Sequence, residues 1–267
     1  MQNNITLGQY FPMNSPVHRL DARFKLFLTI FFIVTVFFAD GLLSYGLVTL
    51  VLGGVIAMSK IPFSMILKSL KPLIIIILFT AILNIFYTKG TPLVSFWIFK
   101  ITYEGIVVAF KMGIRIILLV AGSSLLTYTT SPIMLTDAME ALLSPLKVFK
   151  VPVNELAMMM SIALRFIPTL MEETQKIMNA QKARGADFET GSLISRAKAL
   201  VPILVPLFVS AFRRADDLAM AMESRCYTGG DNRTRLKPLV ATGSDFVILV
   251  GCILVFSGII VLGCFGL

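Results

Sequence analysis

The chain has 267 residues, of which 57% are hydrophobic and 15% charged, and its mean hydropathy is +0.85. A soluble domain usually carries about a quarter charged residues, so this composition excludes an ordinary soluble protein. The net charge of +9 does not indicate nucleic-acid binding, because aromatic residues are not interleaved with the basic ones and much of the basic excess flanks apolar runs. Three cysteines without C-x-x-C spacing and a single histidine predict neither a disulfide framework nor a metal site.

The N-terminal residues are polar and show no cleavage pattern, so we expect this segment to be retained. Five apolar runs follow and predict five membrane spans, at residues 26–39, 41–59, 72–88, 106–130 and 246–267. The first is short against the roughly 20 residues that cross the hydrocarbon core, so it must include flanking residues such as Phe24. The prediction is an all-α polytopic membrane protein with about five transmembrane helices and amphipathic cytoplasmic coupling helices.

The distribution of lysine and arginine predicts the orientation of these spans. One side carries Arg19, Arg23, Lys25, Lys60, Lys68 and Lys71, whereas the other carries Lys89 and Lys100. We therefore expect a multi-pass protein of the bacterial cell membrane with a cytoplasmic N-terminus and an extracellular C-terminus. The expected division is a transmembrane domain of four spans (1–130), a cytoplasmic domain (131–243) and a C-terminal span (244–267).

Residues 131–243 hold 14 of the 24 basic and 11 of the 15 acidic residues, so they are not expected to form ordinary spans. Ser131 followed by Pro132 is typical of a helix start. The pattern predicts amphipathic helices near 132–147, 153–184, 193–206 and 207–226. Pro168 lies inside the longest of these and either bends it or divides it near Ile167.

Two of these helices are predicted to end in an arginine. An apolar stripe at steps of three and four runs along 153–184 and continues in phase to Arg184, just before Gly185. The number of residues from Leu218 to Arg225 is the same as the number from Ile177 to Arg184. A cation at a helix end is stabilised by the helix dipole alone. The alternative is that each arginine enters a carboxylate-lined groove on a soluble partner, with small Ala183 and Ser224 allowing close approach.

The surroundings of these arginines resemble the transmembrane T component of energy-coupling factor transporters over nearly the whole chain. One matching block begins with Arg165-Phe166-Ile167-Pro168, includes Glu172 and ends with the run from Ala180 and Gln181 through Ala183-Arg184-Gly185 to Phe188. A second block runs from Arg214 through Glu223-Ser224-Arg225-Cys226 to Tyr227, and a third covers residues 18–26. Ser224 and Cys226 replace the family's usual Ala and Gly, and Ala22 replaces its Pro.

The resemblance implies a non-catalytic coupling subunit. In that family two cytoplasmic ABC ATPases, which bind ATP and Mg²⁺, dock on the two coupling helices, and an integral substrate-binding S component takes up vitamins or other micronutrients. The chain itself would bind no cofactor and no nucleic acid. Because a residue other than glycine is disfavoured in a left-handed cap, we expect the helix at Cys226 to end differently from the helix at Gly185.

Two further features have open interpretations. Lys111 and Arg115 lie four residues apart on one face of a span, where they either snorkel and pair within the chain or contact a second membrane subunit. Met158, Met159, Met160, Met171, Met178, Met220 and Met222 either fill a core or form an adaptable partner surface.

Two rival functions remain. A lipid-modifying membrane enzyme would need catalytic groups, yet Asp137, Glu140 and Glu155 lack metal-ligand spacing, and P-loop and zinc-protease motifs are missing from the sequence. A secondary transporter normally shows two repeated membrane halves, and no such repeat is seen. We therefore predict no catalytic residues in this chain.

Overall fold

The computed structural model describes residues 10–88, 91–96, 99–188, 192–229 and 241–265. Apart from one short hairpin, the secondary structure in these ranges is helical. The protein is therefore an all-α, multi-pass membrane protein, as predicted. The chain divides into two compact units, which we call unit 1 (residues 1–138 and 239–267) and unit 2 (residues 139–238).

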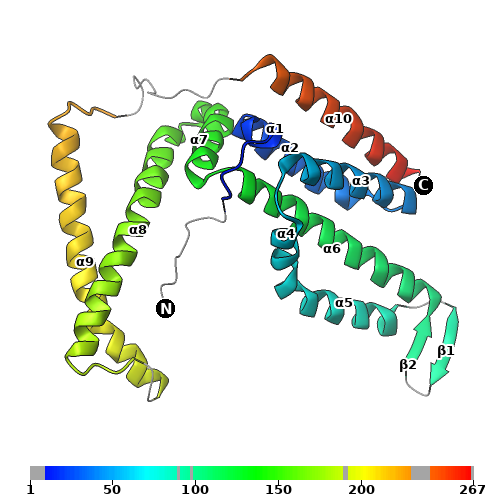
Figure 1. Ribbon diagram of the computed structural model, residues 1–267, viewed down its shortest axis with the longest axis horizontal. Helices are drawn as coiled ribbons and strands as arrows, with labels where there is room; N and C mark the ends of the chain where they lie inside the picture. The colour runs from blue at the N-terminus through cyan, green and yellow to red at the C-terminus, as the bar shows by residue number, and fades with distance from the viewer. Residues whose placement is uncertain (1–9, 89–90, 97–98, 189–191, 230–240, 266–267) are drawn as a thin grey trace. The chain divides into compact units, whose positions relative to one another are not determined.

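Unit 1 contains most of the long apolar helices, which lie side by side (Figure 1). Its elements are α1 (Pro16–Arg19), α2 (Ala22–Phe38), α3 (Leu42–Ser59), α4 (Phe63–Leu70), the 3-10 turn η1 (Lys71–Leu73), α5 (Ile74–Tyr87), α6 (Tyr103–Thr129) and α10 (Gly243–Cys264). Helix α7 (Pro132–Leu143) crosses the boundary between the units. The Ser131 hydroxyl accepts a hydrogen bond from the Met134 amide at 3.4 Å, consistent with the predicted helix start.

A short hairpin interrupts the helices of unit 1. Strands β1 (Pro92–Phe96) and β2 (Phe99–Thr102) pair antiparallel in the connection between the third and fourth predicted spans, where the sequence indicated no strands. At its end the Thr102 hydroxyl accepts a hydrogen bond from the Gly105 amide at 3.2 Å and so caps the start of α6.

The core of unit 1 lies where α2, α3, α6 and α10 meet. Phe32 and Phe256 are each 6% exposed, and their ring centroids lie 6.0 Å apart. Two glycines permit close approach, because a side chain at Gly122 would overlap the Phe32 ring and one at Gly263 would overlap the Phe38 carbonyl of α2. Small residues at helix contacts are a common solution in membranes, where close packing drives helix association.

The membrane spans differ in part from the prediction. Among the residues that the structure describes, five helical segments have the length and composition to cross a bilayer: Leu42–Ser59, Phe63–Tyr87, Tyr103–Thr129, Val153–Ala183 and Gly243–Cys264. Three of them match predicted runs, and a fourth extends the predicted 72–88 run back through α4. The run at 26–39 becomes α2, a 17-residue helix that includes Phe24. The fifth segment is α8, which was predicted to be one of the cytoplasmic helices.

Unit 2 consists mainly of two 31-residue helices, α8 (Val153–Ala183) and α9 (Leu193–Glu223), preceded by the 3-10 turn η2 (Ser144–Phe149). Figure 1 shows α8 and α9 side by side and running in opposite directions. Pro168 lies inside α8 without dividing it. After this proline the helix contacts α9 through Glu173, and before it Ile162 lines a hollow together with residues of α9. Packing beside α9 offsets the lost backbone hydrogen bond.

The predicted division of α9 into helices at 193–206 and 207–226 is wrong. Pro202 and Pro206 both lie inside one continuous helix. Ile203, between them, is 5% exposed, and the Pro202 carbonyl accepts a 3.4 Å hydrogen bond from the Gln181 side chain. Packing against α8 thus holds together a segment whose prolines by themselves favour a break.

Candidate functional site

The C-terminal end of α8, residues 181–186, is named the first tip. Its backbone closes with two hydrogen bonds, from the Ala186 amide to the Gln181 carbonyl and from the Gly185 amide to the Lys182 carbonyl, both at 3.0 Å. Gly185 has a φ of 88°. This pattern is a Schellman motif, in which a left-handed residue turns the chain away from the helix axis. Arg184 therefore occupies the last position before the turn.

The C-terminal end of α9, residues 222–227, is named the second tip, and it closes in the same way. The Tyr227 amide donates to the Met222 carbonyl at 3.1 Å and the Cys226 amide to the Glu223 carbonyl at 2.9 Å. Cys226 has a φ of 56°, so the expectation that this helix ends differently is wrong. The two Schellman hydrogen bonds offset the left-handed conformation, which costs a residue with a Cβ atom about 1–2 kcal/mol.

The residues predicted to dock partners are exposed at both tips: Ala183, Arg184, Gly185, Ser224, Arg225 and Cys226. Each guanidinium extends from a helix C-terminus, where the unpaired carbonyls carry a partial negative charge. An arginine offers a planar pair of N–H donors that match a carboxylate. Each tip can therefore bind a carboxylate on another protein, with little side-chain bulk on either side of the arginine.

A hollow of about 420 Å³ adjoins the second tip. Arg225, Cys226 and Tyr227 line one side of it, and Met158 and Ile162 of α8 line the other. This hollow was not predicted from the sequence, because it depends on how α8 packs beside α9.

The supporting residues named from the sequence are dispersed along the two helices. Arg165 and Glu172 are exposed on α8, on either side of Pro168. Gln181 connects α8 to α9 through its hydrogen bond to the Pro202 carbonyl, and Glu223 contributes a backbone carbonyl to the second tip. Glu173, the neighbour of Glu172, was missed, although it forms an ion pair with Arg214 of α9 at 2.8 Å.

Several of the methionines that the sequence analysis singled out are exposed in unit 2. Met159 is 55% exposed and Met220 is 61% exposed, so these side chains do not fill a core in this structure. Their exposure favours the interpretation as an adaptable surface.

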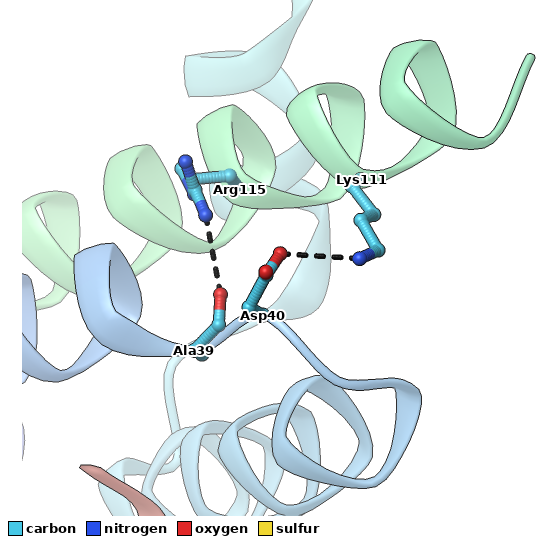
Figure 2. Close-up of polar contacts among 4 residues, drawn as sticks. All are labelled: Ala39, Asp40, Lys111 and Arg115. Carbon is cyan, nitrogen blue, oxygen red and sulfur yellow. Dashed lines mark hydrogen bonds and ion pairs between the residues drawn. The ribbon is translucent and has the colours of Figure 1, made fainter. Parts of the chain in front are cut away.

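The two cations in α6 have partners within the chain (Figure 2). The Lys111 ammonium donates to the Asp40 carboxylate and the Arg115 guanidinium to the Ala39 carbonyl, each at 3.1 Å. Both acceptors lie in the short connection between α2 and α3. Pairing within the chain is therefore observed, as one of the two interpretations predicted, and it fixes this connection against α6.

Among the residues that the structure describes, no cluster of three or more histidine, cysteine, aspartate or glutamate side chains is arranged to hold a metal ion.

Comparison with known proteins gives a consistent assignment. Residues 13–236 match the family model described as cobalt transport protein. The chain is 53% identical to the energy-coupling factor transporter transmembrane protein EcfT of Ruminiclostridium cellulolyticum, over 98% of both chains. It is 50% identical to the protein of the same name from Bacillus subtilis, over 95% of this chain and 96% of that one. These relatives are named as transmembrane components of a transporter, which implies a non-catalytic subunit. The chain belongs to the family of energy-coupling factor transporter transmembrane proteins.

Proposed function

We propose that this chain couples two cytoplasmic ATPase subunits to an integral substrate-binding subunit that takes up vitamins or other micronutrients. The observation that supports this most strongly is the repetition of one device within unit 2. Arg184 and Arg225 both stand at the last position before a left-handed turn, at the ends of helices of equal length. Two identical exposed contacts on one unit suit a pair of related partners.

Docking follows from the chemistry of the tips. A carboxylate in a groove of each ATPase would pair with the arginine fork, while the small residues beside it allow the groove to close around the helix end. ATP and Mg²⁺ would be bound by the ATPases, because the sequence of this chain contains no P-loop. Movement of the ATPases would then be transmitted along α8 and α9.

The substrate-binding subunit would pack against the exposed apolar side chains of α8 and α9. Phe208 is 60% exposed and Phe212 is 68% exposed, in addition to the methionines of unit 2. In the segment that also carries most of the charged residues, large exposed apolar side chains are typical of a binding surface. We place this unit at the cytoplasmic face of a bacterial cell membrane, with the N-terminus inside and the C-terminus outside, because the basic residues flank that side of the spans.

The test is co-purification of the ATPases with Arg184→Ala, Arg225→Ala and the double variant, isolated from native membranes. Each single variant should lose most of one ATPase contact, and the double variant should retain neither ATPase. Arg213→Ala removes an exposed cation from the middle of α9, far along the helices from both tips, so it should co-purify as the unaltered protein does.

Unchanged assembly of the double variant would contradict the proposal. Two other outcomes would favour the rivals: lipid modification by the purified chain alone would indicate an enzyme, and uptake without ATP by the chain alone would indicate a secondary transporter.

A further inference from the structure

The two long helices of unit 2 are related by a constant offset in residue number. Glu173 and Arg214 are 41 positions apart, and their side chains form the 2.8 Å ion pair between α8 and α9. The same offset leads from Arg184 to Arg225, and both of these residues hold the same position in a Schellman motif. When a two-fold axis relates two antiparallel helices, a residue and its equivalent on the other helix contact each other only where the axis passes between them. The ion pair therefore marks a local two-fold axis of the helix pair.

Contacts on either side of the ion pair agree with this symmetry. Ile162 and Met222 line the same hollow. The same offset makes Ile203 on α9 the equivalent of Ile162, and Gln181 on α8 the equivalent of Met222. The Gln181 side chain bonds to the carbonyl of Pro202, the residue next to Ile203. The helix levels that line the hollow are thus equivalent to those joined by the Gln181 hydrogen bond on the other side of the axis.

The ion pair is also equidistant from the two tips. Glu173 precedes Arg184 by the same interval as Arg214 precedes Arg225. The interval makes about three helical turns, or roughly 16 Å, so each ion-pair residue lies on the same helix face as the arginine of its tip. Because the helices are antiparallel, the tips lie about 33 Å apart along the helix direction, with the ion pair midway between them.

The side chains at this midpoint are less exposed than those at the tips. The Glu173 side chain is 22% exposed and that of Arg214 is 38% exposed. Glu173 also accepts a hydrogen bond from the Ser210 hydroxyl, one turn before Arg214. These contacts link α8 to α9 at a point where a small change in crossing angle would move both tips by equal amounts in opposite directions.

We propose that Glu173 and Arg214 are positioning residues whose ion pair sets the crossing of α8 and α9 and thereby the spacing of the two arginine tips. The pair acts through Arg184 and Arg225 rather than by touching a partner. This role rests on the proposed function. With the ion pair in place, the two ATPase partners would move α8 and α9 together as one body.

The test measures the distance between spin labels at Asn179→Cys and Met220→Cys in the full chain in nanodiscs, with Cys226, Cys252 and Cys264 replaced by serine. These label positions are exposed, and the offset that relates the two tips also relates them. With the ion pair intact we expect one narrow distance distribution. Glu173→Ala or Arg214→Ala should broaden it at least twofold, and the exchanged pair Glu173→Arg with Arg214→Glu should restore the narrow distribution.

Arg213→Ala is the matched control, because it removes an exposed arginine next to Arg214 on the same helix, and it should leave the distribution unchanged. An unchanged width in either single alanine variant, or a broad distribution in the exchanged pair, would overturn the proposal. Because this measurement needs no ATPase, its result is independent of the co-purification of the tip variants.

Discussion

Unit 1 and unit 2 differ in how much apolar surface they bury on their own. Unit 1 contains a cluster of buried side chains from five packed helices, including Val36, Val48 and Phe256. In the described part of unit 2, the buried apolar residues are Val153, Ala157 and Ile203. Two helices side by side have too few neighbours to enclose their apolar residues.

This difference separates the roles of the two units. A helix pair with a large exposed apolar surface gains stability when a partner covers that surface. Unit 1 has the internal packing of a stable membrane scaffold, whereas unit 2 buries little apolar surface by itself and would be covered by the subunits of the proposed function.

The largest expected effect comes from replacing one phenylalanine in each unit, which tests the difference in burial between unit 1 and unit 2. Phe256→Ala removes a 6% exposed ring from the core of unit 1 and should destabilise the chain by about 3 kcal/mol. Phe212→Ala removes a 68% exposed ring from unit 2 and should change stability by less than about 0.5 kcal/mol while weakening co-purification of the substrate-binding subunit. Thermal unfolding in detergent measures the first effect, and pull-down measures the second. Equal destabilisation by both changes would remove the distinction between the units.

A second substitution tests the close packing within unit 1. Gly263→Ala places a methyl group against the Phe38 carbonyl, so one of the two helices must move, at a cost of about 1–3 kcal/mol. Gly258→Ala is the control on the same helix, because no atom of another element lies within 4 Å of its added methyl group. The melting temperature should fall for the first variant alone. A similar fall for both would show that the contact with Phe38 is not responsible, because replacing glycine by alanine in a helix by itself favours the helix.

The two tips of unit 2 permit a smaller, local test. Cys226→Gly removes the strain of a residue with a Cβ atom in the left-handed conformation. It should stabilise the second tip by up to about 1 kcal/mol, after allowance for the greater freedom of glycine in the unfolded chain. Gly185→Ala should destabilise the first tip by about 1 kcal/mol. Hydrogen exchange at the amides of residues 226 and 227, and of 185 and 186, reports each change. Faster exchange at the second tip in Cys226→Gly would show that the strain is absent.

The smallest effect concerns the polar edge of unit 1. His18 bonds through its ring to the Phe11 carbonyl at 3.0 Å and to the Ser15 hydroxyl at 2.7 Å. Partial burial, together with nearby Lys25, lowers the pKa of His18 below its ordinary value of 6.5. The folded state therefore favours the neutral ring, and this contribution to stability is complete above pH 6.5 and is lost as the pH falls through the lowered pKa. NMR titration of this single histidine measures the pKa directly, and a value at or above 6.5 would contradict the assignment.

Local patterns in the sequence were sufficient for most of the spans and for the first tip. Long apolar runs form helices because the backbone must satisfy its own hydrogen bonds in lipid. Arg184 before Gly185 predicted a helix end, because glycine adopts the left-handed conformation at low cost. The second tip was the exception, because the preference of Cys226 was outweighed by the hydrogen bonds that close the same turn.

The sequence by itself therefore determined the class of protein, most of the apolar spans and the arginines at the ends of two helices, since each depends on residues close together in the chain. Only the tertiary structure decided that α8 and α9 continue through their prolines, that Lys111 pairs with Asp40 and that Glu173 meets Arg214. These outcomes depend on contacts between residues distant in the sequence, which helical periodicity does not specify. The interval between Arg184 and Arg225 was visible in the sequence. Only the antiparallel packing of α8 and α9 showed that Glu173 and Arg214, which are separated by the same interval, contact each other.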